Sequence, residues 1–98
     1  MHINKIVNDT ILNIAIDGRL DTTTAPQLEE ELKQSMNGIT RLVLDFEKLE
    51  YISSAGLRVL LAAQKVMNTQ GEMIVKNVNE VVGEVFEITG FLDILTIE

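Results

Sequence analysis

Two adjacent serines, Ser53 and Ser54, are the side chains of this sequence that best combine reactive chemistry with a suitable position. They precede Ala55, where a helical pattern of apolar residues begins, so one hydroxyl is predicted to cap that helix by accepting a backbone N–H. A serine in the first turn also lies where backbone donors and the helix dipole stabilise an added phosphate. Because no histidine or lysine base has a route to these hydroxyls, we interpret them as a substrate of another protein rather than as a nucleophile.

The other groups with catalytic potential are few. His2 is the single histidine and cannot form a metal site alone. Asp45, Glu47 and Glu50 cluster around the end of a predicted strand and leave open a small metal-dependent hydrolase or phosphotransfer protein, although a solvated loop is the favoured interpretation. The chain has no cysteine and neither a Gly-x-Gly-x-x-Gly nor a Walker-type motif, so thiolate metal sites are excluded and a nucleotide cradle has no support. We therefore expect no enzyme, no cofactor and no metal.

Composition restricts the kinds of partner. Fifteen acidic residues against eight basic ones give a formal net charge of −7, which disfavours nucleic acid and anionic membranes because both need a positive surface. Hydrophobic residues make up 46% and aromatic residues 4%, so we expect one aliphatic core and a single domain over residues 1–98. No apolar run approaches the roughly 18 residues of a membrane span. The expectation is a cytoplasmic protein that is not inserted in a membrane and is monomeric when free.

Apolar periodicity and turn residues predict eight elements in the order ββαβαβαβ, an α/β fold. The predicted strands cover residues 3–7, 11–16, 41–46 and 73–75, and residues 91–97 are predicted to form a final extended stretch. The predicted helices cover residues 24–37, 53–70 and 79–88. Thr24 and Gln27 have the spacing of a capping box, and Pro26 suits the first helical turn. The second helix has apolar residues over most of its circumference, so we expect it to be largely buried. The third is expected to pack on the core through Val82, Val85, Phe86 and Thr89.

This order of elements predicts where a binding site lies. Two right-handed βαβ crossovers bring the strand ends at Ile16, Phe46 and Lys76 to one edge of the sheet, together with the helix N-termini. Binding sites in such sheets collect beyond the carboxyl ends of the strands. Three loops are expected to meet there, at 18–24, 47–54 and 77–79.

Several segments resemble the signature of bacterial anti-sigma factor antagonists, the stand-alone STAS domains. The matching segments are Leu42-Val43-Leu44-Asp45-Phe46 with Tyr51-Ile52-Ser53-Ser54-Ala55-Gly56-Leu57, then Gly18-Arg19-Leu20-Asp21 with Thr24-Ala25, Gly71-Glu72-Met73 and Thr89-Gly90-Phe91. The resemblance implies a STAS-type mixed sheet with helices and a non-catalytic regulator of transcription. In that family the unmodified antagonist sequesters an anti-sigma factor serine kinase, phosphorylation of a serine at the start of the second helix ends the binding, and a serine phosphatase restores it.

Laid on this chain, the family pattern Asp-Ser-Ser/Thr-Gly-Leu makes Ser54 the phosphorylation site. Ser53 stands in the place of the aspartate and Ala55 in that of the second Ser or Thr, so Ser53 stays the alternative acceptor. The residues that the resemblance implies for partner binding are Asp21, Thr22, Thr23, Ser53, Ala55, Gly56 and Arg58.

Two of these residues have a specific predicted role beside a plainer one. Arg58, four residues after Ser54, lies on the same helical face and could pair with the phosphate, or it is an exposed solubilising charge. Asp21 orients the serine hydroxyl or docks the kinase, or it is a turn residue or helix cap. A different overall interpretation makes the chain a non-switching STAS subunit of a larger assembly, such as a lipid-transport ATPase complex or a signalling scaffold, with Ser54 serving as a cap.

Overall fold

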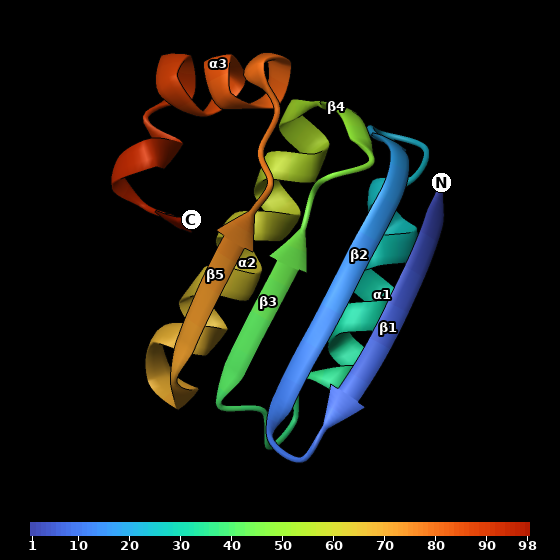
Figure 1. Ribbon diagram of the computed structural model, residues 1–98, viewed down its shortest axis with the longest axis vertical. Helices are drawn as coiled ribbons and strands as arrows, with labels where there is room; N and C mark the ends of the chain where they lie inside the picture. The colour runs from blue at the N-terminus through green and yellow to red at the C-terminus, as the bar shows by residue number, and fades with distance from the viewer.

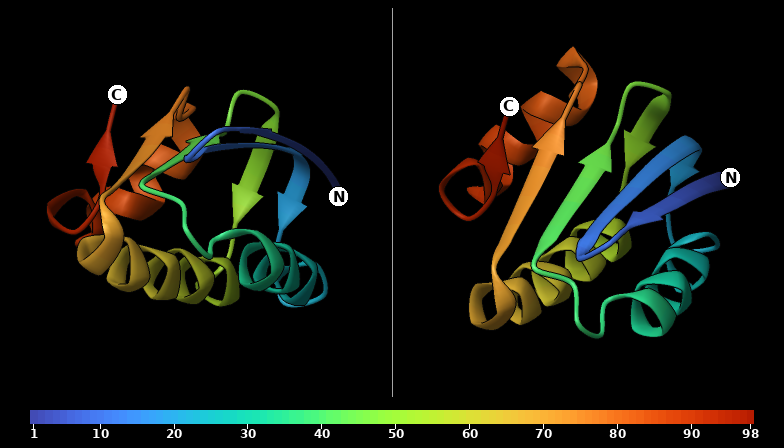
Figure 2. Two further views of the ribbon diagram at one scale, coloured as in Figure 1. Left: turned by 90° about the horizontal axis from the view of Figure 1, so that it is seen from below. Right: turned by 60° about the horizontal axis from the view of Figure 1, so that its bottom comes forward.

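A mixed β-sheet packs against two helices in the computed structural model, which describes all 98 residues (Figure 1). The strands are β1 (His2–Asn8), β2 (Ile11–Leu20), β3 (Arg41–Asp45), β4 (Leu49–Ile52), β5 (Glu72–Lys76) and β6 (Thr96–Ile97), and the helices are α1 (Ala25–Ser35), α2 (Ser54–Gln70), α3 (Glu80–Thr89) and the 3-10 helix η1 (Phe91–Asp93). β1 and β2 are antiparallel and all other pairs are parallel, in the order β1-β2-β3-β5-β6 with β4 beside β2. α1 and α2 form one layer, and α3 lies apart from it (Figure 2). The predicted α/β fold is confirmed.

The central strand and the first hairpin follow the sequence pattern. Leu42, Val43 and Leu44 of β3 are all buried, as expected for a strand that lies between β2 and β5. Asp9 and Thr10 join β1 to β2, and Asp9 adopts the positive φ (59°) that a two-residue hairpin turn requires. None of the helices combines the length and the apolar character that crossing a membrane requires.

The second strand is longer than predicted, and a strand that the sequence analysis missed pairs with it. β2 continues past Ile16 to Leu20; it pairs with β3 up to Ala15 and with β4 from Gly18, and the β4 pairing shifts register between Gly18 and Arg19. Gly18 has a φ of 111°, which favours glycine, and its N–H donates to Lys48 O at 3.0 Å. Asp17-Gly18 therefore lies within a strand and does not end it, and the extra residue of the register shift is Glu50 on β4.

The C-terminal prediction was also wrong. Residues 91–97 do not form one extended stretch, because Gly90 ends α3 in the left-handed region (φ 80°) and the chain then turns through η1. Hydrogen bonds from Asp93 N to Gly90 O and from Leu95 N to Phe91 O hold this turn. The two residues of β6 alone are extended.

The helices differ from prediction at their caps and on one face. The Thr24 hydroxyl makes no capping bond to α1; it accepts from Asp21 N at 2.9 Å and donates to Arg19 O at 2.8 Å, so the predicted capping box is absent. α2 buries one face, but Ala62 and Val66 are exposed, so it is less buried than predicted. On α3, Val82 and Phe86 are buried, whereas Val85 is half-buried and Thr89 exposed.

The side chain of Gln70, at the end of α2, forms hydrogen bonds with the backbone at and after the end of α1. Its Nε2 donates to Met36 O at 3.0 Å and to Ile39 O at 2.8 Å, which joins the end of α2 to the C-cap residue of α1 and to the loop that follows it. We expect Gln70→Ala to lower the free energy of unfolding by about 1–2 kcal/mol, measured by urea titration. Gln34→Ala is the matched control, because exposed Gln34 bonds to Glu30 alone (3.1 Å) and its loss should cost under about 0.5 kcal/mol. Equal effects of the two variants would contradict this role.

Candidate partner-binding site at the start of α2

Hydrogen bonds join the three loops at the carboxyl edge of the sheet, as predicted. Ser53 N donates to Leu20 O at 2.9 Å, which fixes the start of α2 against the end of β2. Asn79 Nδ2 donates to Leu49 O at 2.7 Å and connects the start of α3 to β4. The loops before α1, α2 and α3 therefore form one continuous edge.

The two serines at this edge are in different environments. Ser54 is the first residue of α2 and is exposed. Ser53 is the N-cap residue, but its hydroxyl makes no capping bond, and its Oγ is buried without a hydrogen-bond partner. The predicted cap is therefore absent, because the Ser53 side chain is turned into the protein. Ser54 is therefore accessible from solvent, and the Oγ of Ser53 is not.

Gly56 sets the position of this turn. A Cβ at residue 56 would lie 2.8 Å from Ile52 Cγ1 and 2.8 Å from Leu20 Cγ, closer than carbon atoms pack. The absence of a side chain lets the first turn of α2 approach the ends of β2 and β4. Gly56 is buried, so it positions the first turn of α2 and offers little surface of its own to a partner.

The carboxylate of Asp21 accepts hydrogen bonds from residues of its own loop. Its Oδ1 accepts from Thr23 N at 3.0 Å, from Thr23 Oγ1 at 2.7 Å and from Thr24 N at 3.2 Å. The side-chain hydrogen bond from Thr23 is the largest of the causes that lower the pKa of Asp21, with desolvation opposing it. No hydrogen bond joins Asp21 to Ser54, so the predicted orientation of the serine hydroxyl is absent and the turn role is the one observed.

The two arginines near this edge differ in their availability. Arg19 lies over the Tyr51 ring, with Cζ 4.5 Å from the centroid, and its Nε is 4.0 Å from Asp21 Oδ2. Arg58 is exposed and takes part in none of the ion pairs. Sequence reasoning missed the Arg19–Tyr51 contact, because the two residues are brought together only by the pairing of β2 with β4.

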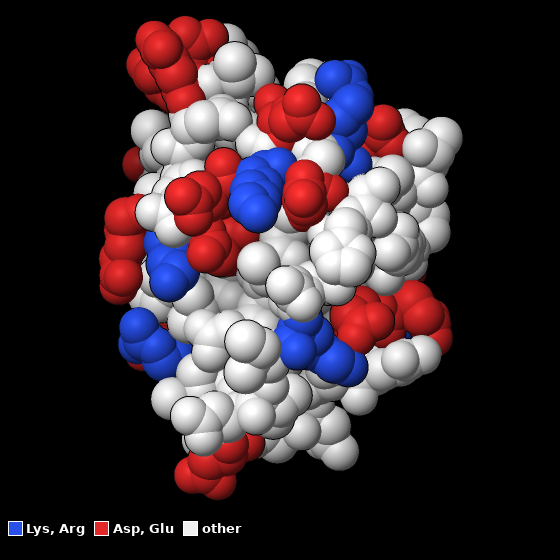
Figure 3. All heavy atoms as spheres, turned by 45° about the vertical axis from the view of Figure 1, so that its right-hand side comes forward, with Lys and Arg blue, Asp and Glu red and all other residues white.

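The residues predicted to bind a partner differ in their exposure. Thr22, Thr23, Ser54 and Arg58 are exposed, and Asp21, Ser53 and Ala55 are half-buried. On the face drawn in Figure 3, Lys and Arg side chains lie singly among Asp and Glu and form no basic patch.

The acidic residues after β3 do not assemble into a metal site. No group of three His, Cys, Asp or Glu side chains is arranged to hold an ion. Asp45 Oδ1 instead accepts from Asn77 Nδ2 at 2.9 Å and from Glu47 N at 3.0 Å. Burial raises the pKa of Asp45, but these two hydrogen bonds and the charge of Lys76 outweigh it, so the pKa lies below its usual 3.8.

The lowered pKa of Asp45 predicts how the stability of the fold changes at acidic pH. A carboxyl whose pKa is lower in the folded state stabilises the fold fully above the unfolded value, here 3.8, and loses that contribution as pH falls through the folded pKa. We expect the free energy of unfolding of Asp45→Asn to depend less on pH below about 4 than that of the parent protein. Urea titrations between about pH 2.5 and 6 measure this, and parallel curves for the two proteins would contradict it.

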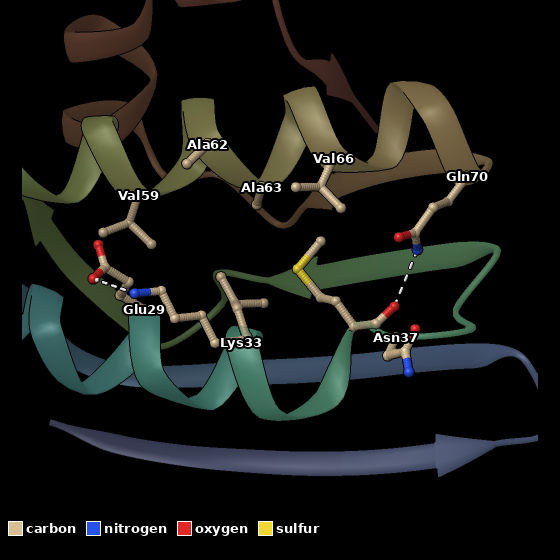
Figure 4. A pocket seen from close by; sticks show the side chains of 10 residues that line it. Glu29, Lys33, Asn37, Val59, Ala62, Ala63, Val66 and Gln70 are labelled. Atoms are coloured by element: carbon tan, nitrogen blue, oxygen red, sulfur yellow. Dashed lines mark hydrogen bonds and ion pairs between the residues drawn. The ribbon is translucent and has the colours of Figure 1, made fainter.

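A groove lies elsewhere, between α1 and α2 (Figure 4). This groove of about 390 Å³ has an apolar floor, and the Glu29–Lys33 pair (3.4 Å) and Gln70 lie on its rim. Its apolar lining residues are Leu32, Met36, Val59, Ala62, Ala63 and Val66. The charged groups of the groove are the exposed, ion-paired Glu29 and Lys33, and no hydroxyl side chain lines it.

The fold and this edge define a class: a small α/β module with an exposed hydroxyl at a helix start and no assembled metal cluster. A family model described as STAS domain matches residues 2–98, so the chain belongs to the STAS domain family, as its signature segments predict.

Similar proteins agree with this assignment. BtrV of Bordetella bronchiseptica, provisionally named an anti-sigma factor antagonist, is 44% identical over 91 residues, which cover 91% of this chain and 78% of BtrV. The anti-sigma-B factor antagonist of Staphylococcus aureus (strain NCTC 8325) is 30% identical over 97 residues, which cover 97% of this chain and 90% of that protein. The structure of SpoIIAA from Bacillus in its phosphorylated form has a TM-score of 0.76 at 19% identity and covers 99% of this chain and 91% of its own, which shows the shared fold. By its relatives, the chain groups with the anti-sigma factor antagonists.

Proposed function

We propose that this protein is a non-catalytic anti-sigma factor antagonist whose binding to a serine kinase is switched by phosphorylation of Ser54. The observation that supports this most is the contrast between the two serines: Ser54 is exposed at the first position of α2, whereas the Oγ of Ser53 is buried. Relatives named as anti-sigma factor antagonists and a fold neighbour solved in a phosphorylated form are consistent with it.

The physical chemistry of the edge suits such a switch. A phosphate on Ser54 brings a charge of about −1.5 to −2 to the N-terminus of a helix, where the dipole stabilises it by about 0.3–1 kcal/mol. Arg58, one turn further along α2 and without an ion-pair partner, is placed to accept this charge. The fold therefore tolerates the phosphate, while a partner seated on the same edge does not.

Incubation with ATP and a candidate kinase tests the acceptor. Mass spectrometry should find one added phosphate, about 80 Da, on the parent protein and on Ser53→Ala, and none on Ser54→Ala. Ser53→Ala is a matched control, because the Ser53 Oγ has no hydrogen bond to lose. Phosphate on Ser53 would show that Ser53, not Ser54, is the acceptor. If no phosphate is added and transporter subunits co-purify stably with the protein, the result would favour a constitutive scaffold role for this protein.

Asp21 offers a separate test of the binding edge. If its carboxylate contacts the kinase, Asp21→Asn should weaken binding about three- to tenfold, since an exposed charge contact at a rim contributes modestly. Isothermal titration calorimetry with the kinase measures this, and unchanged affinity would leave Asp21 with its turn role alone. Asp93→Asn, on η1, is the control for the loss of one negative charge.

A further inference from the structure

The C-terminal part of the chain exposes apolar side chains that nothing in the protein covers. Of the eight large hydrophobic side chains that are exposed, four lie in this part: Val81 (52%), Ile88 (86%), Leu92 (48%) and Ile94 (43%). This concentration within fourteen residues of sequence differs from the scattered apolar exposure of ordinary surfaces, and gathered patches of this kind mark interaction sites.

Two of these exposed side chains, Val81 and Ile88, lie on α3 together with the half-buried Val85. Val81, Val85 and Ile88 are separated by four and three residues and so lie on one face of α3, which we name the α3 stripe. The adjacent side of α3, about a third of a turn away, is already used, because Val82 and Phe86 are buried and the Phe86 ring lies 6.5 Å from that of Phe46. Half-buried Val85 lies at the boundary with this core-facing side, and Val81 and Ile88 are exposed without a packing partner.

Charge identifies the kind of occupant. Glu80, Glu84 and Glu87 recur at the same four- and three-residue spacing and form an acidic row along one side of the stripe. Residues 77–98 contain five acidic residues and no Lys, Arg or His, so this segment contributes −5 of the net charge of −7. A complementary surface must be apolar along its centre and basic along its margin.

We propose that the α3 stripe is a docking surface for an amphipathic helix of a partner protein that has Lys or Arg residues beside its apolar face. A second copy of this chain is the poorer occupant, because an antiparallel two-fold pairing of α3 places the acidic rows of both copies along one seam, and a parallel pairing offers neither row a basic residue from this segment. Anionic lipid and nucleic acid are repelled by the same row. The surface goes beyond the proposed function, since none of its residues belongs to the edge around Ser54.

A designed peptide tests this without knowledge of the partner. The probe is an 18-residue (about five-turn) helical peptide with Leu at positions i, i+3, i+4 and i+7 and Lys beside them. Its binding to the full 98-residue chain is followed by NMR amide shifts and fluorescence anisotropy. Two control peptides have the same length: one with Glu in place of Lys, and one with the same composition in scrambled order. The Lys peptide should bind and shift amides of residues 80–94, and both controls should bind about tenfold more weakly or not at all.

Variants of the protein separate the two components of the surface. Ile88→Ser and the double variant Glu84→Gln/Glu87→Gln should each weaken the Lys peptide about five- to tenfold. Because the Ile88 side chain is 86% exposed, its replacement should leave the stability of the fold nearly unchanged. Ile6→Ser, at a similarly exposed apolar residue (65%) on β1, is the matched control and should bind as the parent does.

The contrary outcomes are equally specific. Equal binding of the scrambled peptide would mean attraction by charge alone, and shifts clustered around Ser54 would assign the peptide to the other edge. Concentration-dependent shifts of residues 80–94 without peptide would make a second copy the occupant. Each of these overturns the proposal, and none depends on whether Ser54 is phosphorylated, so the two proposals can fail separately.

Discussion

Phosphorylated protein should bind its kinase partner about 100- to 1,000-fold more weakly than unmodified protein, and Ser54→Glu should reproduce at least tenfold of this loss. Ser54 is exposed at the helix start, so a phosphate there enters any contact made by this edge. Inserting a hydrated dianion into a desolvated contact costs several kcal/mol, and each 1.4 kcal/mol is a factor of ten in affinity. The helix dipole returns no more than about 1 kcal/mol. Calorimetric titration of the kinase with each form measures the difference.

The same change should leave the fold almost unaffected. Because the Ser54 side chain is exposed at the first position of α2, the melting temperature of Ser54→Glu should lie within about 3 °C of the parent. Asn37→Glu is a charge control, since Asn37 is exposed after the end of α1 and its change should not affect kinase binding. A loss of affinity that tracks a loss of thermal stability, or equal affinity of the two forms, would remove the switch from the proposed function.

The edge around Ser54 could be predicted from sequence because it rests on local patterns. Apolar β3 followed by the apolar helix α2 requires a parallel crossover, and this alone places the start of α2 at the carboxyl edge. β4 escaped prediction for the opposite reason: its four residues have only Leu49 and Ile52 buried, and its existence depends on pairing with residues 18–20 of β2. Short strands whose partner is distant in sequence leave little local signal.

The state of Ser53 could not be predicted either. Its sequence position before an apolar helix is typical of an N-cap, and residue type alone favours the capping bond. In the folded protein the hydroxyl is buried without a partner, because the backbone of Ser53 is held by Leu20 O and Gly56 packs against the ends of β2 and β4. Local propensity was overridden by tertiary packing, and this packing is what leaves Ser54 as the accessible hydroxyl.

The junction between α2 and β5 has the largest predicted effect on stability. A Cβ at Gly71 would overlap the backbone carbonyl of Thr40 and lie 3.0 Å from its Cα. Backbone hydrogen bonds hold this junction in place: Gly71 N donates to Met67 O at 2.7 Å, and Glu72 N donates to Thr40 O at 3.0 Å. A side chain there must push α2 and the start of β5 away from the loop that leads into β3, because backbone atoms cannot rotate aside as side chains do.

Gly71→Ala should therefore lower the free energy of unfolding by about 3 kcal/mol or more, a large share of the roughly 5–15 kcal/mol that stabilises a domain of this size. Since 1 kcal/mol shifts the melting temperature of such a domain by about 4–8 °C, calorimetry should find a decrease of more than about 12 °C. Gly83→Ala is the matched control: its Cβ would meet only Val78 Cγ1 at an ordinary 3.7 Å, inside α3, and should raise stability by about 0.5–1 kcal/mol. The opposite signs distinguish a steric requirement at Gly71 from a general effect of replacing glycine, and a stable Gly71→Ala protein would show that the start of β5 can move away from Thr40 at little cost.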